Sequence, residues 1–232
     1  MASYLTWPRG LLPPREERLA LSGMVTTGGM SIGGISQTTN STGGGFWTLQ
    51  QTGIWVRTRD QVRAWRALEA ILDGGVTGII VPFCDRRFAP TSVTGIVPHS
   101  DGAFFFDDTG YESGASAVTF DQDAALRATT VFLDVGAIEL QGGEHFTVNH
   151  EGAPRLYRIA RVIEQVGDVA EVQIRPPLRA AVTAATDADF ANPRCVMKLA
   201  SADEMPLNLE LGKSGQASVR FVEAFGVDAL AE

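Results

Sequence analysis

The sequence contains few of the residues on which many protein classes depend. Of its 232 residues only two are cysteine, Cys84 and Cys195, and only three are histidine. Two thiols cannot build a disulfide framework or a zinc site with four thiolate ligands. The counts predict a protein made in a reducing cytoplasm. Each cysteine lies in an apolar segment, so we expect both thiols to be buried and unreactive.

Long apolar runs are also missing. No uninterrupted run approaches the ~20 apolar residues that a membrane-spanning helix needs. The first residues lack the basic and then apolar order of a secretory signal. We therefore expect no membrane insertion. With 44% apolar and 20% charged residues, the chain is too apolar and too weakly charged to be disordered.

Lysine is nearly absent, because Lys198 and Lys213 are the only two among 19 basic residues. The net charge is −8, which is unfavourable for a nucleic-acid-binding surface. Gly28 and Gly33 have the glycine spacing of a Walker loop, but Gly34 and Ile35 follow where lysine and a hydroxyl residue should stand. The sequence therefore predicts no phosphate-binding loop and no cofactor.

A search for catalytic and metal-binding patterns also gives no candidate. The sequence has no G-x-S-x-G nucleophile motif. His145 and His150 are five residues apart, so on one strand they face opposite sides and cannot hold the same ion. The polar group of His99, Asp101, Asp107 and Asp108 matches no known calcium-loop spacing. We predict that the protein is not an enzyme and has no metal site.

Most of the chain has the pattern of short β-strands. Apolar and β-branched segments recur between glycine and proline turns, both before residue 84 and from about residue 118 onward. One helix is expected over 59–73. It begins with a capping box formed by Thr58 and Gln61 and ends at Gly74-Gly75. The pattern predicts a mainly β fold of barrels or sandwiches with one flanking helix.

Two segments are candidates for contact between subunits. Residues 28–45 hold seven glycines in eighteen positions and show no apolar period. We predict that they form an assembly loop anchored by Met30, Ile32 and Ile35, with a solvated hairpin tip as the alternative. The second segment is the run Phe104, Phe105 and Phe106. Three adjacent aromatic side chains cannot all face inward on one strand, so the run is either a subunit contact or a small local core.

The C-terminal half resembles a known protein family over roughly residues 125–225. The resemblance rests on three motifs: Gly142-Gly143-Glu144-x-Phe146 leading to Leu156-Tyr157-Arg158-Ile159, Pro176-Pro177-Leu178-Arg179, and Asn192-Pro193-Arg194-Cys195 leading to Leu199-Ala200-Ser201. These motifs are similar to those of distal tail proteins of long-tailed, siphovirus-like bacteriophages. They are structural signatures, and they carry no catalytic residue.

The resemblance implies a virion structural protein of the phage tail tip, or baseplate, assembled in the host cytoplasm. Six copies of such a protein form a ring that joins the tail tube to the hub and fibres, near the tape-measure protein. DNA passes through the lumen of the ring without specific binding, for which the acidic charge balance is suitable. The exact ring symmetry, and a tube or neck position rather than the distal tail, stay open.

The resemblance also implies a domain layout. A tail-tube-like β-barrel is expected over 16–84 together with 192–226, and a small inserted β-barrel over 125–182. An N-terminal arm covers 1–15, a loop-rich connection 85–124 and a C-terminal tail 227–232. The alternative function is a carbohydrate-binding module that contacts the host surface through the inserted domain. Only Tyr157 could supply the stacking aromatic ring there.

Overall fold

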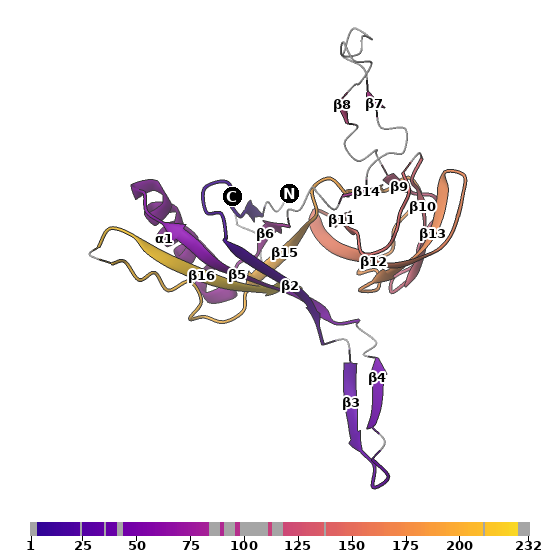
Figure 1. Ribbon diagram of the computed structural model, residues 1–232, viewed down its shortest axis with the longest axis horizontal. Coiled ribbons are helices and arrows are strands. Elements are labelled where there is room, and N and C mark those ends of the chain that lie inside the picture. Colours follow the sequence, from indigo (N-terminus) through magenta and orange to yellow (C-terminus); the bar gives the residue numbers. More distant parts are fainter. Residues whose placement is uncertain are drawn as a thin grey trace. The chain divides into compact units, whose positions relative to one another are not determined.

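The structure is a computed structural model that describes residues 4–23, 25–34, 36–40, 44–83, 89–90, 96–97, 111–112, 118–136, 138–210 and 212–226 (Figure 1). The chain divides into two compact units. Unit 1 consists of residues 1–82 and 195–232, and unit 2 of residues 83–194. Both units are built mainly from β-strands, so the mainly β fold expected from the sequence is confirmed. Among the described residues, no helix is long and apolar enough to cross a membrane.

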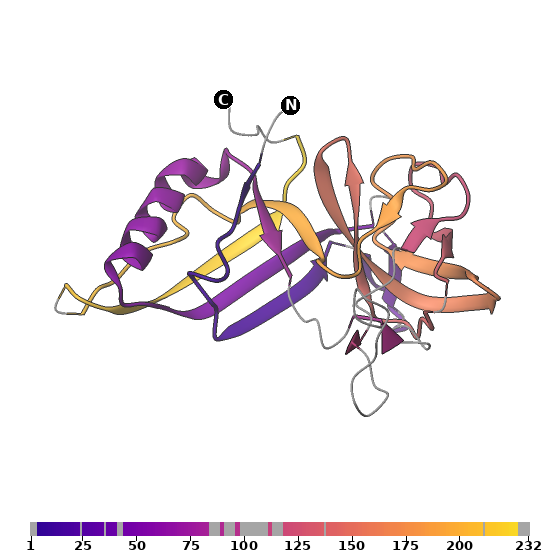
Figure 2. The same ribbon diagram turned by 90° about the horizontal axis from the view of Figure 1, so that it is seen from above.

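Unit 1 is a six-stranded sheet with one helix on one of its faces (Figure 2). The sheet has the order β1-β6-β15-β16-β5-β2, in which β1 and β6 are parallel and the pairs β15–β16, β16–β5 and β2–β5 are antiparallel. A separate two-stranded sheet pairs β3 with β4. The element bounds are β1 Leu5–Thr6, β2 Glu16–Ser22, β3 Val25–Met30, β4 Ser36–Asn40, β5 Phe46–Val56, α1 Arg59–Leu72, the 3-10 turn η1 Asp73–Gly75, β6 Ile79–Pro82, β15 Arg194–Leu199 and β16 Gly215–Glu223.

Helix α1 begins and ends where the sequence predicts. The Thr58 hydroxyl accepts the Gln61 backbone N–H at 3.2 Å, and the Gln61 side chain accepts the Thr58 N–H at 3.1 Å. This reciprocal pair satisfies two N–H groups that the first turn leaves without partners. At the other end, Asp73 and Gly74 take left-handed backbone angles, which stop the helix.

The apolar stripe of α1 is buried. Trp65, Leu68 and Leu72 are almost fully covered, whereas Arg66 on the other side of the helix is exposed. The Trp65 indole N–H also donates to the Met205 carbonyl at 2.9 Å. Burial of this stripe, more than helix propensity, holds the helix on the sheet.

We expect Leu68→Ala to lower the free energy of unfolding by about 2–5 kcal/mol, because it removes a buried side chain and leaves a cavity. Arg66→Ala is the matched control on the exposed side and should change it by less than about 0.5 kcal/mol. Urea denaturation followed by circular dichroism measures both. Equal small effects would contradict the burial of this stripe.

Aromatic rings connect the helix to the sheet in unit 1. The Trp7 ring meets Trp65 edge-on at a centroid distance of 6.1 Å and meets Phe221 of β16 at 5.2 Å. Trp7 follows strand β1, and its backbone N–H donates to the Ile80 carbonyl at 2.8 Å. The N-terminal segment is therefore part of the core that joins α1 to β16.

Unit 2 contains a six-stranded antiparallel sheet that is nearly closed into a barrel. Its order is β11-β12-β13-β10-β9-β14, and a bridge between Thr147 and Asp189 connects the first strand to the end of the last. Alternate residues of the strands fill the interior, among them Phe146, Ile159 and Val172. The bounds are β9 Val118–Phe120, β10 Thr130–Asp134, β11 His145–His150, β12 Ala153–Val166, β13 Val169–Arg175 and β14 Asp187–Ala188, with a separate pair β7 Ile96–Val97 and β8 Tyr111–Glu112.

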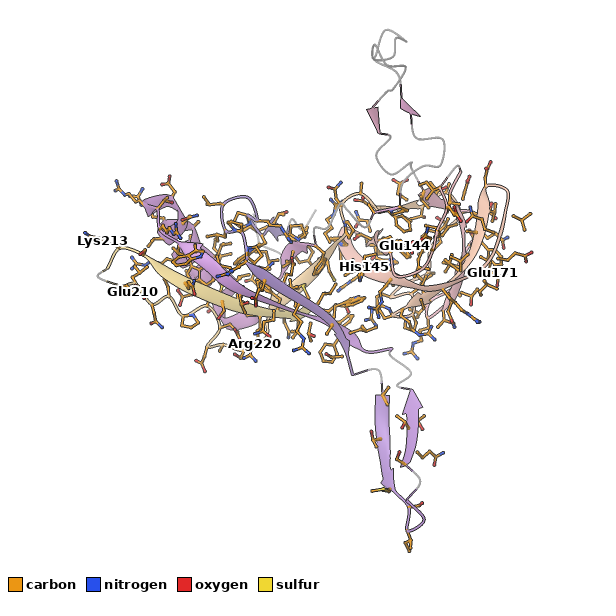
Figure 3. The ribbon with its side chains drawn as sticks, viewed as in Figure 1. Glu144, His145, Glu171, Glu210, Lys213 and Arg220 are labelled. Carbon is orange, nitrogen blue, oxygen red and sulfur yellow. The ribbon has the colours of Figure 1, made fainter. Side chains whose placement is uncertain are left out.

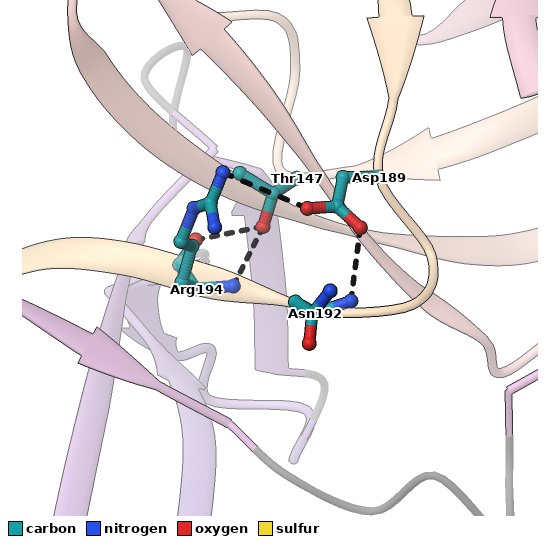
Figure 4. Close-up of polar contacts among 4 residues, drawn as sticks. All are labelled: Thr147, Asp189, Asn192 and Arg194. Atoms are coloured by element: carbon teal, nitrogen blue, oxygen red, sulfur yellow. Dashed lines mark hydrogen bonds and ion pairs between the residues drawn. The ribbon is translucent and has the colours of Figure 1, made fainter. Parts of the chain in front are cut away.

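A polar cluster closes this barrel (Figure 4). The Thr147 hydroxyl donates to the Arg194 carbonyl at 2.8 Å and accepts the Arg194 backbone N–H at 2.7 Å. The Asp189 carboxylate accepts the Asn192 N–H at 2.9 Å and lies 3.6 Å from the Arg194 guanidinium. These contacts fix the turn through which the chain leaves the barrel. They also account for the Asn192-Pro193-Arg194 motif as a structural signature.

The strands differ from the sequence prediction in two respects. Residues 28–45 were predicted to form an assembly loop, with a solvated hairpin tip as the alternative, and much of the segment belongs to the β3–β4 hairpin. The short strands β1 and β14, each of two residues, were not predicted. Such short strands have too few residues to show an alternating pattern, and their neighbours in the sheet define them.

Candidate functional site

The β3–β4 hairpin is the strongest candidate for a functional surface. It begins where the β2–β5 ladder ends at the pair Ser22 and Phe46. In the hairpin, Val25 pairs with Asn40 and Thr27 with Thr38, and the register shifts at Gly28-Gly29 before Met30 pairs with Ser36. The hairpin extends away from the six-stranded sheet of unit 1 as an arm (Figure 1).

The composition of the arm explains this local structure. Threonines favour an extended backbone, and Gly29 and Gly34 take positive φ angles of 85° and 77° that other residues adopt at a cost. The turn at the tip is closed by the Gly34 N–H, which donates to the Ser31 carbonyl at 2.9 Å. The glycines therefore serve the shift in register and the turn, and the segment is not a structureless loop.

The arm exposes apolar side chains to solvent. Val25 is 49% exposed, Met30 74% and Ile32 111%. The side chains that the structure describes between Val25 and Thr39 are all exposed, so neither face of the hairpin rests on a core. β3 and β4 pair with each other and, among the described strands, with no other. A two-stranded hairpin of this kind is only marginally stable by itself in water.

The arm also lacks the usual protection against pairing with another chain. Residues 19–56 contain no charged side chain and no proline. Charged residues and proline are the common means by which exposed strand edges avoid pairing with another chain. An uncharged hairpin with two open edges and exposed apolar groups is suited to strand addition by a partner.

The predicted contact residues have different outcomes. Met30 and Ile32 both lie on the arm and are exposed, as an assembly role requires, but their role in contact stays a prediction. Ile35 and the run Phe104, Phe105 and Phe106 lie outside the described residues, as does Cys84. Val25 was not singled out from the sequence. Its signal was present, because it is an apolar residue within the uncharged segment 19–56.

A buried polar chain inside unit 2 has a structural explanation. The Arg179 N–H donates to the Tyr157 hydroxyl at 2.9 Å, and this hydroxyl lies 2.8 Å from His150 Nε2. The direction of this second bond follows from the tautomer of the His150 ring, since the Tyr157 hydroxyl can either donate or accept. Burial first, and then the positive charge of Arg155, lowers the pKa of His150 to about 4, consistent with a neutral ring.

His145 is also neutral at pH 7. Burial and the nearby Arg158 lower its pKa to about 4, although Glu144 acts in the opposite direction. His150 contacts Tyr157, whose ring is part of the barrel core, whereas His145 alternates with the core residue Phe146 and so points out of the barrel. The expectation that the two histidines face opposite sides is confirmed.

Among the residues that the structure describes, no three His, Cys, Asp or Glu side chains are grouped to hold a metal ion. Cys195 is fully buried, as expected, and its sulfur lies 3.5 Å from the Val196 carbonyl. His99, Asp101, Asp107 and Asp108 lie outside the described residues. The β3–β4 arm is thus the strongest candidate for a functional feature among the described residues.

Comparison with known proteins gives no family assignment, since no protein-family model matches the chain and a search of curated proteins finds no match.

Proposed function

We propose that this chain is a structural assembly subunit that forms a ring at the tip of a bacteriophage tail. The observation that carries an assembly role is the β3–β4 arm, because an uncharged hairpin with exposed Met30 and Ile32 needs a partner surface to cover it. The placement in a phage tail rests on the sequence resemblance over residues 125–225. The partners are other copies of the chain, in a ring of six, with the tube and hub proteins on either side.

The carbohydrate-binding alternative has less support. A sugar site of the expected kind needs an exposed aromatic ring for stacking, and Tyr157 was the only candidate. Its ring is fully buried against Phe146, and its hydroxyl is bonded within the barrel. Tyr157 therefore cannot stack on a sugar while the barrel is folded.

We expect that shortening the arm abolishes assembly without unfolding the subunit. The variant replaces residues 27–38 by Asn-Gly, which gives a two-residue turn between the paired residues Thr26 and Thr39. Because the described side chains of the arm pack on no core, the melting temperature should stay within a few degrees of the wild type. Electron microscopy of tails made with each form of the subunit measures incorporation.

A milder pair of variants controls for the shortened backbone. Met30→Ser with Ile32→Ser removes the apolar groups of the arm, and Val76→Ser removes an apolar group that is 60% exposed elsewhere in unit 1. The first should reduce incorporation into tails and the second should not. Normal yields of tails with the shortened arm would exclude its assembly role. Absence of the chain from the tips of purified tails, judged by antibody labelling, would exclude the phage-tail proposal itself.

A further inference from the structure

Two pairs of like charges lie directly opposite each other on neighbouring strands of unit 2. In the antiparallel β12–β13 ladder, Arg158 is the partner of Arg175, and Glu164 is the partner of Glu171. Directly opposite like charges destabilise a sheet, whereas opposite charges in the same positions stabilise it. The β12–β13 ladder thus sets two pairs of like charges opposite each other.

All four side chains lie on the outside of the barrel. Arg158 alternates along β12 with the core residues Tyr157 and Ile159. On β13, Glu171 and Arg175 alternate with core residues, which are Ala170, Val172 and Ile174. Successive side chains of a strand point to opposite faces, so the charged residues of β13 face outward. Glu164 follows a bulge in β12 and is exposed. Figure 3 labels Glu171 on the outer side of the barrel.

The same four residues would have formed two pairs of opposite charge if Glu171 and Arg175 had been exchanged along β13. Instead, basic groups gather at one end of the face and acidic groups at the other. Arg161 is exposed and lies beside the arginine pair on β12. The neighbouring His145, opposite Arg158 on β11, adds no charge at pH 7 because its pKa is about 4. We name the surface formed by Arg158, Arg161, Glu164, Glu171 and Arg175 the β12–β13 face.

Apolar groups lie beside the acidic end of this face. Ile163, the extra residue of the bulge, is 43% exposed, and Val166 near the end of β12 is 69% exposed. Glu171 lies between Glu164 of β12 and Phe132 of β10, and the Phe132 side chain is half-buried. The acidic end thus combines two carboxylates with apolar surface, which is the composition of a contact region and not of a purely solvated one.

We propose that the β12–β13 face binds the same face of a second copy of this chain, related by a two-fold axis. The two pairs are four residues apart on β13, roughly 13 Å at the usual rise of a strand. A two-fold axis between them places the arginine pair of each copy on the glutamate pair of the other. A two-fold copy matches both ends of the face at once, whereas a polyanion is repelled by the glutamates and a polycation by the arginines.

This contact is separate from the proposed ring. A two-fold contact uses the same surface on both copies and is complete with two of them, whereas a ring of six needs two different surfaces on each subunit. The β12–β13 face therefore joins two copies, within one assembly or between two, whether or not the arm forms a ring. We infer this two-fold contact from the register of the β12–β13 ladder and from the charges of its residues, and the inference does not depend on the arm.

The test measures self-association of the full chain by sedimentation equilibrium. Glu164→Lys with Glu171→Lys makes the face entirely basic, and Arg158→Glu with Arg175→Glu makes it acidic except for Arg161. Each double variant should dimerise at least about tenfold more weakly than the wild type, a change of about 1.4 kcal/mol. An equimolar mixture of the two should regain association, because a basic face then meets an acidic one. Association of the wild type should weaken as salt is raised from about 0.05 M to 0.5 M, since salt screens charges at a surface.

Controls separate this contact from folding and from the ring. Asp187→Lys with Glu69→Lys makes the same charge change at exposed carboxylates of β14 and α1, and should leave dimerisation unchanged. If Arg158→Glu prevents folding, Arg161→Glu with Arg175→Glu serves as the acidic variant. The wild type and the shortened-arm variant should dimerise alike through this face. A monomeric wild type, folded variants that dimerise as tightly as the wild type, or a mixture that does not associate would each overturn the proposal.

Discussion

Trp7→Ala should lower the free energy of unfolding of unit 1 by about 3–5 kcal/mol, the usual cost of removing a buried aromatic ring. Trp7 is 1% exposed, and its ring contacts both Trp65 on α1 and Phe221 on β16. Its loss leaves a cavity where the helix meets the sheet. This is a large share of the total, because domains of this size are stable by only about 5–15 kcal/mol.

The matched control is Trp55→Ala. Trp55 lies on β5 of the same sheet, but it is 40% exposed, and its ring meets the Arg57 guanidinium at 4.2 Å. Removing this ring leaves no enclosed cavity, so we expect a cost of about 1 kcal/mol or less. Chemical denaturation of both variants, followed by tryptophan fluorescence and circular dichroism, gives the comparison. If Trp7→Ala and Trp55→Ala lowered the free energy of unfolding by similar amounts, Trp7 would not be the residue that joins the helix to the sheet.

The second large effect is a loss of stability of unit 2 in acid. His145 and His150 have folded-state pKa values of about 4, below the 6.5 of the unfolded chain. Between these two values the unfolded chain binds protons that the folded barrel excludes. The stability that unit 2 gains from keeping both histidines neutral is therefore fully present above pH 6.5, and it is lost as the pH falls toward 4. Each shift corresponds to at most about 3 kcal/mol. Because solvent screens these partly exposed rings, we expect about 2–3 kcal/mol for the pair.

The double variant His145→Gln with His150→Gln tests this effect. The Gln side chain at position 150 can still form a hydrogen bond with the Tyr157 hydroxyl, but it does not titrate. The free energy of unfolding is measured at pH 7 and at pH 4.5 for both proteins. Over this interval the free energy of unfolding of the wild type should fall by about 2 kcal/mol more than that of the variant. The carboxylates titrate in both proteins, so their contribution cancels in the comparison. An equal loss in the two proteins would mean that neither histidine is protected from protons.

Features that depend on neighbours along the chain were predicted well from the sequence. The capping box of Thr58 and Gln61 and the stripe of Trp65, Leu68 and Leu72 depend on contacts within four residues, so their spacing alone specified α1. The long strands β5, β12 and β16 were also indicated by their alternating or β-branched residues. Exposed Met30 and Ile32 were singled out because apolar residues were rare in a polar, glycine-rich segment.

Only the tertiary structure decided which strands lie together and in what register. The sequence showed Arg158, Glu164, Glu171 and Arg175, but a slip of one residue in the β12–β13 ladder would have placed other residues opposite each of them. The bonds from Arg179 and His150 to Tyr157 likewise join residues 22 and 7 positions from it in the chain. Local propensity contains no information on such distant pairs. The packing of the barrel core fixes them, because a single register places Ile159, Val172 and Ile174 in its interior.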